Sequence, residues 1–494
     1  LSSDTYHAAH DDPVIAAHFE QGGDRRSAAN HYLSAAHHAR KLSSNKEAER
    51  HYNKVLELVN EDKDLVYHAH KDLEVICHNQ GKRDGQMQHI SQMQLLAEEE
   101  GNDHWKAEAL CRRMAYYQGI GEPNKTLKLF DRVIKVAVKA EDYYCQADAY
   151  RILARAKLDL GEIEEALANV AKGVEIVEKQ PEISAVLSDL YHIRGNALYY
   201  RGKMDLAIET YKKALEMFRA EQKRTQESTI LMNLGFLSSI SGAYEKAITY
   251  YKRAYEIDLE KGDRLNTGIK LANLAQTHIE LGNYPSAKKL LREARKLCEH
   301  TRDTGALSDT TLTIAQLKIR QGRHVEAMRH IQTGIEYALT ANSRIDEIRG
   351  LLLWAECQLD DPDGEYQQAL DKSKEAIALS EKAKLPDGLI HGLMLQARSL
   401  LKLGRADEAV QVSSQAVTFT TVSKIHGVDT IYHLHGLVMR ALKEPYWAHL
   451  FIQKAWDEVQ RSAPLLSLDK QKQRYLSVKP AVDILKDYNS LEER

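Results

Sequence analysis

The sequence predicts an all-α solenoid, a right-handed superhelix of about twelve antiparallel helix pairs with a repeat of about 40 residues. Three observations predict it: a composition rich in helix formers, small residues that recur at a fixed interval, and apolar residues three to four apart on both sides of each recurrence. Pro and Gly contribute only 9 and 26 of the 494 residues. Because a repeat array buries apolar surface between neighbouring units, a chain of this length needs no single central core.

The recurrence is a glycine followed five residues later by an alanine. It is found at Gly161/Ala166, Gly202/Ala207, Gly242/Ala247, Gly282/Ala287, Gly322/Ala327, Gly364/Ala369 and Gly404/Ala409, with intervals of 41, 40, 40, 40, 42 and 40 residues between the glycines. Another small residue stands twelve positions after each glycine: Gly173, Ala214, Ala254, Ala294, Gly334, Ala376 and Ala416. Small side chains at fixed places let one helix backbone approach the next, so we interpret them as packing contacts.

Each unit is predicted to be a helix A, a tight turn at the glycine and a helix B. In the unit from Thr229 to Gly262, apolar residues at helical spacing precede the turn and a second set follows it. Gly242 is suited to the left-handed backbone conformation that ends a helix.

The run "GNALYYRGKMDLAIETYKKALEMF" resembles the tetratricopeptide repeat. The residues that match its signature places are Gly195, Tyr199, Gly202, Ala207, Tyr211 and Ala214. The 40-residue period is longer than the usual 34 of that family. The match is specific from about Cys145 to Val417; it is looser before this, where Gly81 and Gly121 keep the spacing, and after it, where Lys443 and Ala448 are in degenerate register.

The two ends of the chain are predicted to differ from the array, which gives three parts: a helical junction or cap at 1–58, a solenoid at 59–462 and capping helices at 463–494. The first part resembles the junction that joins the ATPase of STAND-class signalling proteins to their C-terminal repeats, in a pattern of His18, Gly23, Ala28, Tyr32, Ala36, Ala39 and Ala48. That resemblance implies a sensor region of a larger regulator, and a first residue other than Met fits a fragment or processed product. At the other end, one or two helices broken at Pro480 are expected to cap the last apolar surface.

Composition argues against several partners and compartments. With 68 basic and 71 acidic residues, the chain lacks the positive charge expected of a nucleic-acid or anionic-membrane binder. No apolar run is long enough to cross a bilayer, and no signal segment opens the chain. The five scattered cysteines indicate a reducing environment, so we expect a cytoplasmic protein.

The candidate sites for chemistry are weak, and we predict no enzyme, no cofactor and no metal. The segment Gly119–Thr126, "GIGEPNKT", has Asn124 where a phosphate-binding loop requires glycine, and no strand is expected before it. The histidine-rich start includes His7 and His10, which are three apart and are able to share a helix face. No carboxylate or cysteine stands at a matching ligand spacing, which leaves a metal-dependent enzyme here as a minor alternative.

The resemblance implies that the A helices line a concave groove that binds a protein or peptide. The groove positions of the family, carried onto this chain, include Arg151, Arg155, Asp189, His192, Asn196, Tyr199, Tyr200, Met232, Phe236, Gln276, Gln316 and Arg320. Asn233 and Asn273 resemble the asparagines with which such grooves hold an extended backbone, although capping or bridging of helices is an alternative role. Cations are missing from the places where the chaperone-tail members clamp a terminal carboxylate, so that ligand is not expected.

Two functions of the binding class remain open. The first is a sensor or scaffold region of a larger signalling regulator, and the second is a stand-alone cytosolic adaptor that bridges two proteins. The small residues at fixed spacing favour binding over catalysis in both cases, because they build an extended surface and no reactive cluster.

Overall fold

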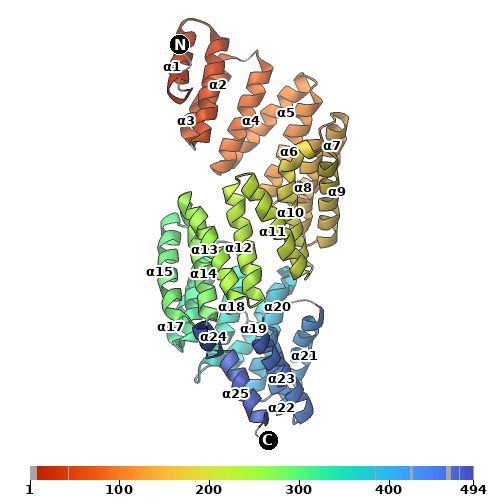
Figure 1. Cartoon of the computed structure of the whole chain (residues 1–494), viewed down its shortest axis with the longest axis vertical. Coiled ribbons are helices and arrows are strands. Elements are labelled where there is room, and N and C mark those ends of the chain that lie inside the picture. Colours follow the sequence, from red (N-terminus) through yellow and green to blue (C-terminus); the bar gives the residue numbers. More distant parts are fainter. Residues whose placement is uncertain are drawn as a thin grey trace. The chain divides into compact units, whose positions relative to one another are not determined.

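The computed structural model describes residues 8–42, 44–59, 61–383, 385–422, 427–462, 469–477 and 479–492, and every regular element in these ranges is a helix (Figure 1). The prediction of an all-α repeat solenoid is therefore confirmed. The helices are α1 (Ala8–Gln21), α2 (Arg25–Lys41), α3 (Asn45–Leu58), α4 (Lys63–Asn79), α5 (Arg83–Glu99), α6 (Asp103–Gly119), α7 (Pro123–Lys139), α8 (Tyr143–Asp159), α9 (Ile163–Lys179), the 3-10 helix η1 (Pro181–Val186), α10 (Leu187–Tyr200), α11 (Met204–Ala220), α12 (Arg224–Ile240), α13 (Tyr244–Glu260), α14 (Arg264–Glu280), α15 (Tyr284–Thr301), α16 (Thr304–Arg320), α17 (His324–Thr340), α18 (Arg344–Asp360), α19 (Tyr366–Ala383), α20 (Pro386–Lys402), α21 (Ala406–Val422), α22 (Val428–Ala441), α23 (Pro445–Ser462), α24 (Asp469–Leu476) and α25 (Ala481–Glu492).

The turn between the two helices of a pair depends on a left-handed residue. The residues with φ between 68° and 76° at this place are Gly81, Gly121, Gly161, Gly202, Gly242, Gly282, Gly322 and Gly404. Lys443 takes the same conformation with φ 62°, in the pair that the sequence predicts to be degenerate. Gly364 serves its longer turn differently, since a Cβ there would lie 1.9 Å from the carbonyl oxygen of Gln358.

The recurring small residues lie where helices pack most closely. The alanines five residues after the turn, from Ala166 to Ala409, are all fully buried. A Cβ added at Gly173 would lie 2.9 Å from Cδ2 of Leu190, and one at Gly334 would lie 2.6 Å from Cδ2 of Leu312. These distances confirm that the small residues are packing contacts, because any larger side chain would separate the helices.

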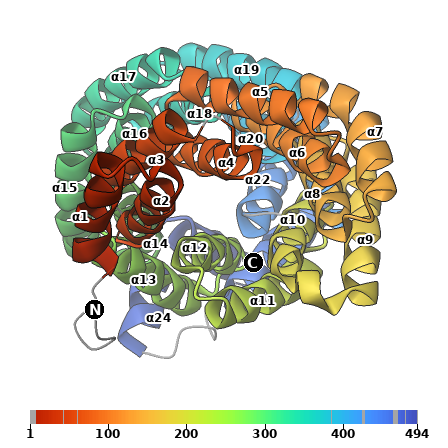
Figure 2. The same ribbon diagram turned by 90° about the horizontal axis from the view of Figure 1, so that it is seen from above.

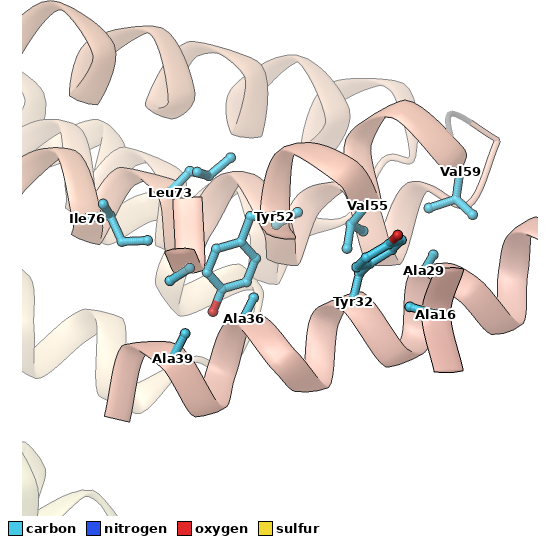
Figure 3. Close-up of a cluster of buried hydrophobic side chains, with 12 residues drawn as sticks. Ala16, Ala29, Tyr32, Ala36, Ala39, Tyr52, Val55, Val59, Leu73 and Ile76 are labelled. Atoms are coloured by element: carbon cyan, nitrogen blue, oxygen red, sulfur yellow. The ribbon is translucent and has the colours of Figure 1, made fainter. Parts of the chain in front are cut away.

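The chain forms two compact units, Leu1–Ala197 and Leu198–Arg494, and the division falls inside α10. Within each unit the core is a series of clusters between neighbouring helices, as expected for a solenoid. The first cluster joins α1–α3 to α4 through Tyr32, Tyr52 and Leu73 (Figure 3). The three-part division at 58 and 462 stays a prediction.

The C-terminal helices pack against helices that come much earlier in the second unit. A cluster of buried residues, here called the C-terminal cluster, consists of Tyr244, Leu281, Ala455, Val459, Tyr475, Ala481 and Ile484. The rings of Tyr244 at the start of α13 and Tyr475 in α24 are 5.9 Å apart. Nζ of Lys479 also lies 3.8 Å from Oδ1 of Asp360, at the end of α18. The closing segment therefore does more than cover the last pair of helices.

We expect Gly322→Ala to lower the free energy of unfolding by about 1 kcal/mol, because an L-residue is strained in the left-handed conformation. A Cβ at Gly322, where φ is 70°, would have nothing within 4 Å, so no steric clash contributes. Urea unfolding followed by circular dichroism measures the change. Gly322→Asn is the control and should lose less, since Asn tolerates this conformation; equal midpoints for all three proteins would contradict the prediction.

Asp487 is expected to hold α25 against α22. Its carboxylate accepts hydrogen bonds from Nε2 of His433 and from Nη1 of Arg440, both at 2.8 Å. The bond to His433, followed by that to Arg440, lowers the pKa of Asp487 to about 2. A carboxyl with a lowered pKa stabilises the folded state above its unfolded pKa, so this contribution should be lost as the pH falls from about 4 to about 2.

The variant Asp487→Asn tests this anchor. Hydrogen-exchange mass spectrometry at neutral pH should show faster exchange of the amides in 481–492 than in the wild-type chain, while α4–α8 exchange as before. Wild type should approach the behaviour of the variant as the pH is lowered through that range. Unchanged exchange in 481–492 would show that the C-terminal cluster alone holds the helix.

Candidate ligand-binding surface on the inner helices

Among α6–α9 in the first unit and α14–α19 in the second, the even-numbered helices lie on the inner side of the array and the odd-numbered helices on the outer side (Figure 2). Figure 2 shows this for α6 and α8 inside α7 and α9 in the first unit, and for α14, α16 and α18 inside α15, α17 and α19 in the second. Consecutive inner helices touch one another as well as their outer partners, for example α6 with α8 and α14 with α16. The inner helices are the A helices of the sequence, which is where the predicted groove residues lie.

In the first unit, two predicted residues come together in a pocket. Arg151 and Arg155 of α8 line it together with Asp159, and Ala115, Gln118 and Gly119 of α6 form the other side, around a volume of about 390 Å³. Nε of Arg151 donates to Oδ1 of Asp148 at 2.6 Å, and Nε of Arg155 donates to Oδ1 of Asp159 at 3.2 Å. Burial and the positive charge of Arg155 lower the pKa of His192 to about 4, so this histidine is neutral at pH 7. Asp189 and Asn196 also interact with other groups of the chain.

In the second unit, predicted aromatic residues form one patch at the end of α10 and on α12. The ring of Tyr199 lies 5.3 Å from that of Tyr200 and packs edge-on against Phe236 at 5.7 Å. The hydroxyl of Tyr199 donates to Oδ2 of Asp387 in α20 at 3.0 Å, which joins helices far apart in the sequence. Tyr200 and Phe236 remain 55% and 43% exposed, so they offer apolar surface to a ligand.

The remaining predicted polar residues of the second unit take part in bonds within or between neighbouring inner helices. Oε1 of Glu280 accepts from Gln276 at 2.9 Å and from Gln316 at 3.1 Å. Arg320 donates to Oε1 of Glu356 at 2.7 Å, in a pair whose side chains are only 16% and 11% exposed. The negative charge of Glu356 raises the pKa of Arg320. The inner face of α14–α18 is therefore held together by its own polar side chains.

Three predicted residues have a more structural setting. Met232 packs on the cluster of Ala247, Tyr251 and Leu274 and is partly committed to the core. Asn233 interacts with other groups of the chain, and Asn273 is half-buried. A role of these asparagines in holding a backbone stays a prediction.

Sequence reasoning missed the partners Asp387 and Glu356. Both lie on the inner helices, but their pairing depends on how helices from different repeats meet. The spacing within one repeat carries no signal for such pairs.

The candidate chemical sites take ordinary structural roles where the structure describes them. Lys125 and Thr126 lie at the start of α7, where Nζ of Lys125 bonds Glu122 and the buried Thr126 hydroxyl donates to the carbonyl of Met114 at 3.3 Å. His7 and the side chain of His10 lie outside the described residues. Within those residues, no group of three or more His, Cys, Asp or Glu side chains is arranged to hold a metal ion, and no helix is long and apolar enough to span a membrane.

Family models of the tetratricopeptide repeat match residues 186–260, 270–302 and 390–413. These three segments are tetratricopeptide repeats. Among curated relatives, human protein O-mannosyl-transferase TMTC1 is 24% identical over 160 residues, which is 31% of this chain and 16% of the transferase. The TPR repeat-containing protein YpiA of Bacillus subtilis is 24% identical over 278 residues, which cover 56% of this chain and 57% of YpiA.

Solved tetratricopeptide structures share the fold. A STAND signal-transduction ATPase with a tetratricopeptide repeat sensor from Pyrococcus horikoshii has a TM-score of 0.53 at 17% identity, over 72% of this chain and 54% of the ATPase. A Rap protein in complex with Competence and Sporulation Factor has a TM-score of 0.52 at 12% identity, over 73% of this chain and 99% of the Rap chain. The quorum sensor NprR of B. thuringiensis also has a TM-score of 0.52, at 18% identity, over 70% of this chain and 99% of the NprR chain. The chain spans about half the length of the STAND protein and a sixth of the transferase.

We expect Glu356→Ala to lower the stability of the tetratricopeptide array by about 2 kcal/mol, because it leaves the half-buried guanidinium of Arg320 without its nearest acceptor. The double variant Arg320→Met/Glu356→Leu should be closer to wild type, since no charge remains without a partner. Urea unfolding measures both, because guanidinium salt would screen the pair. A single variant as stable as wild type would show that the pair contributes little.

Proposed function

We propose that this tetratricopeptide protein binds a protein or peptide on the inner face of its helix array, as the sensor or scaffold region of a larger signalling regulator. The observation that carries the proposal is the exposed aromatic surface of Tyr200 and Phe236 beside polar inner helices. Aromatic side chains provide much of the binding energy of protein interfaces, and polar groups around them orient a backbone.

The relatives support the same kind of function. The Rap protein is complexed with Competence and Sporulation Factor, and the STAND protein carries a tetratricopeptide repeat as its sensor. Because the chain matches 54% of the STAND protein, membership of a larger regulator is part of the proposal. A stand-alone adaptor is the alternative, favoured by the match to YpiA over about half of each chain. An ATPase domain with a phosphate-binding loop in the reading frame upstream of Leu1 would support the regulator hypothesis. A reading frame without such a domain would support the adaptor hypothesis.

Selection from a random peptide library displayed on phage, with the full chain as bait, tests inner-face binding. The selected peptides are then titrated calorimetrically into wild type, Asn196→Ala and Phe236→Ala. We expect at least one variant to bind about tenfold more weakly, a loss of about 1.4 kcal/mol.

The matched control is Lys289→Ala on the outer helix α15, where an exposed side chain is removed and affinity should not change. Equal affinity of wild type and both inner-face variants would contradict binding at these residues.

A further inference from the structure

The closing segment, residues 469–492 with α24 and α25, covers the turn side of much earlier repeats, where the inner helix of a pair turns into the outer helix. Tyr475, Ala481 and Ile484 of the segment share the C-terminal cluster with Tyr244 at the start of α13 and Leu281 after α14. All five residues belong to the unit Leu198–Arg494. The closing segment therefore folds back onto the array of its own unit.

Equivalent positions in the same unit show how much the array covers by itself. Leu281 stands one residue before its turn glycine and is 3% exposed. At the same position of other pairs, Leu403 is half-buried, and Arg201, Ser241 and Gln321 are exposed. Packing between neighbouring repeats leaves this position at least partly open to solvent. The extra burial of Leu281 therefore comes from the C-terminal helices of its cluster.

The tyrosines that follow the turn glycine by two residues give the same result. They are Tyr244 in α13, Tyr284 in α15 and Tyr366 in α19. Tyr284 and Tyr366 are half-buried, whereas Tyr244 is 6% exposed and its ring lies 5.9 Å from that of Tyr475. Without the closing segment, Tyr244 and Leu281 would offer apolar surface at the turn side of the array.

The closing segment is held by fewer buried side chains than a helix of the array. The inner helix α14 buries nine of its residues, whereas α25 buries Ala481 and Ile484 among its described side chains. The contact between Lys479 and Asp360 adds little, because the side chain of Lys479 is 49% exposed and the two charged atoms are 3.8 Å apart. Local release of the segment is therefore much less costly than unfolding of the array.

The polar anchor of the closing segment lies away from the surface that the segment covers. The carboxylate of Asp487 accepts hydrogen bonds from His433 and Arg440, both in α22. These bonds join α25 to the last regular pair of helices, and not to the turns that carry Tyr244 and Leu281. A change at Asp487 therefore loosens the segment and leaves the covered surface intact.

The covered surface adjoins the inner face of the second unit. Leu281 directly follows Glu280, whose carboxylate accepts a hydrogen bond from Gln316 of the next inner helix. Asp360, at the end of α18, accepts a hydrogen bond at 2.5 Å from Arg398 of the inner helix α20 and also contacts the closing segment. A ligand that lies along α14–α18 meets the closing segment at these helix ends.

We infer that the closing segment is a releasable strap, which occupies a helix-binding surface at the turn side of α13–α18 until a partner helix replaces it. The inference rests on the proposed function, because this surface is an edge of the inner face. The strap itself shows the chemistry that the partner needs. Its helix has an apolar face with an aromatic residue, which packs on Tyr244 and Leu281, and a basic residue that reaches Asp360.

A peptide with the sequence of residues 469–492 is the probe, because it has the chemistry of the strap. The fluorescein-labelled peptide is titrated into the full-length wild-type chain and into full-length Asp487→Asn, and fluorescence anisotropy gives the dissociation constants. The strap of the variant has lost its anchor, whereas the peptide keeps Asp487 and is able to bond α22. The matched control is Gly404→Ala, which strains a turn of the same unit where φ is 73° and a Cβ would have nothing within 4 Å.

We expect the peptide to bind Asp487→Asn about tenfold more tightly than wild type, because the strap that competes with it is docked less firmly. Gly404→Ala should bind the peptide within twofold of wild type, since its strap is unchanged. A peptide with both Tyr475→Ser and Ile484→Ser should bind none of the chains, because it lacks the apolar face.

Two results overturn the strap: no binding of the peptide to wild type or Asp487→Asn, or equal affinity for these two chains. Both results leave inner-face binding intact if peptides from the phage library bind Asn196→Ala or Phe236→Ala more weakly than wild type. Library peptides that bind both of these variants as they bind wild type contradict the proposed function. The titration with the strap peptide then decides by itself whether the closing segment is released.

Discussion

The close approach of helix backbones at the recurring small residues is the constraint on which the rest of the structure depends. A Cβ at Gly173 or Gly334 would come within 3 Å of a leucine side chain on a neighbouring helix, so only that leucine fits between the two helices there. Such contacts fill space at the density of a crystal and gain dispersion energy over the whole helix length. The outer helices are committed to this packing on two sides. The inner helices keep one edge free, and this edge carries the predicted groove residues.

The fold follows from the sequence because its determinants are local. A left-handed glycine, a buried alanine five residues on and a stripe of apolar residues all act within one repeat, so their spacing predicts the helices and turns of most pairs. The turn of one pair has Lys443 in place of the glycine. Lys443 takes the same left-handed conformation, in which an L-residue is strained. The packing of Tyr475 against Tyr244 is different: it joins segments far apart in the chain, and no periodic signal connects them.

In the candidate site, too, the sequence predicts features within one repeat but not contacts between repeats. The register within a repeat placed Gln276, Gln316 and Arg320 on inner helices, and the structure finds them there. It did not reveal that Glu280 and Glu356 bond Gln316 and Arg320 across neighbouring repeats, because such bonds depend on side-chain reach between helices. These partners change the energetics of binding. A ligand that takes a hydrogen bond from Arg320 replaces one that already exists, so its net gain is small. Apolar contact with Tyr200 and Phe236 needs no such exchange.

The inner faces of the two units therefore offer different conditions to a ligand. In the first unit, the pocket between α6 and α8 is open, and the Arg155–Asp159 ion pair that lines it is half-exposed. In the second unit, the closing segment contacts Leu281 and Asp360 at the ends of α14 and α18. A ligand that occupied those helix ends would have to displace the segment, and its affinity would fall by the free energy that docks α24 and α25. That free energy includes the bonds of Asp487 to His433 and Arg440 in α22, since they help to hold α25.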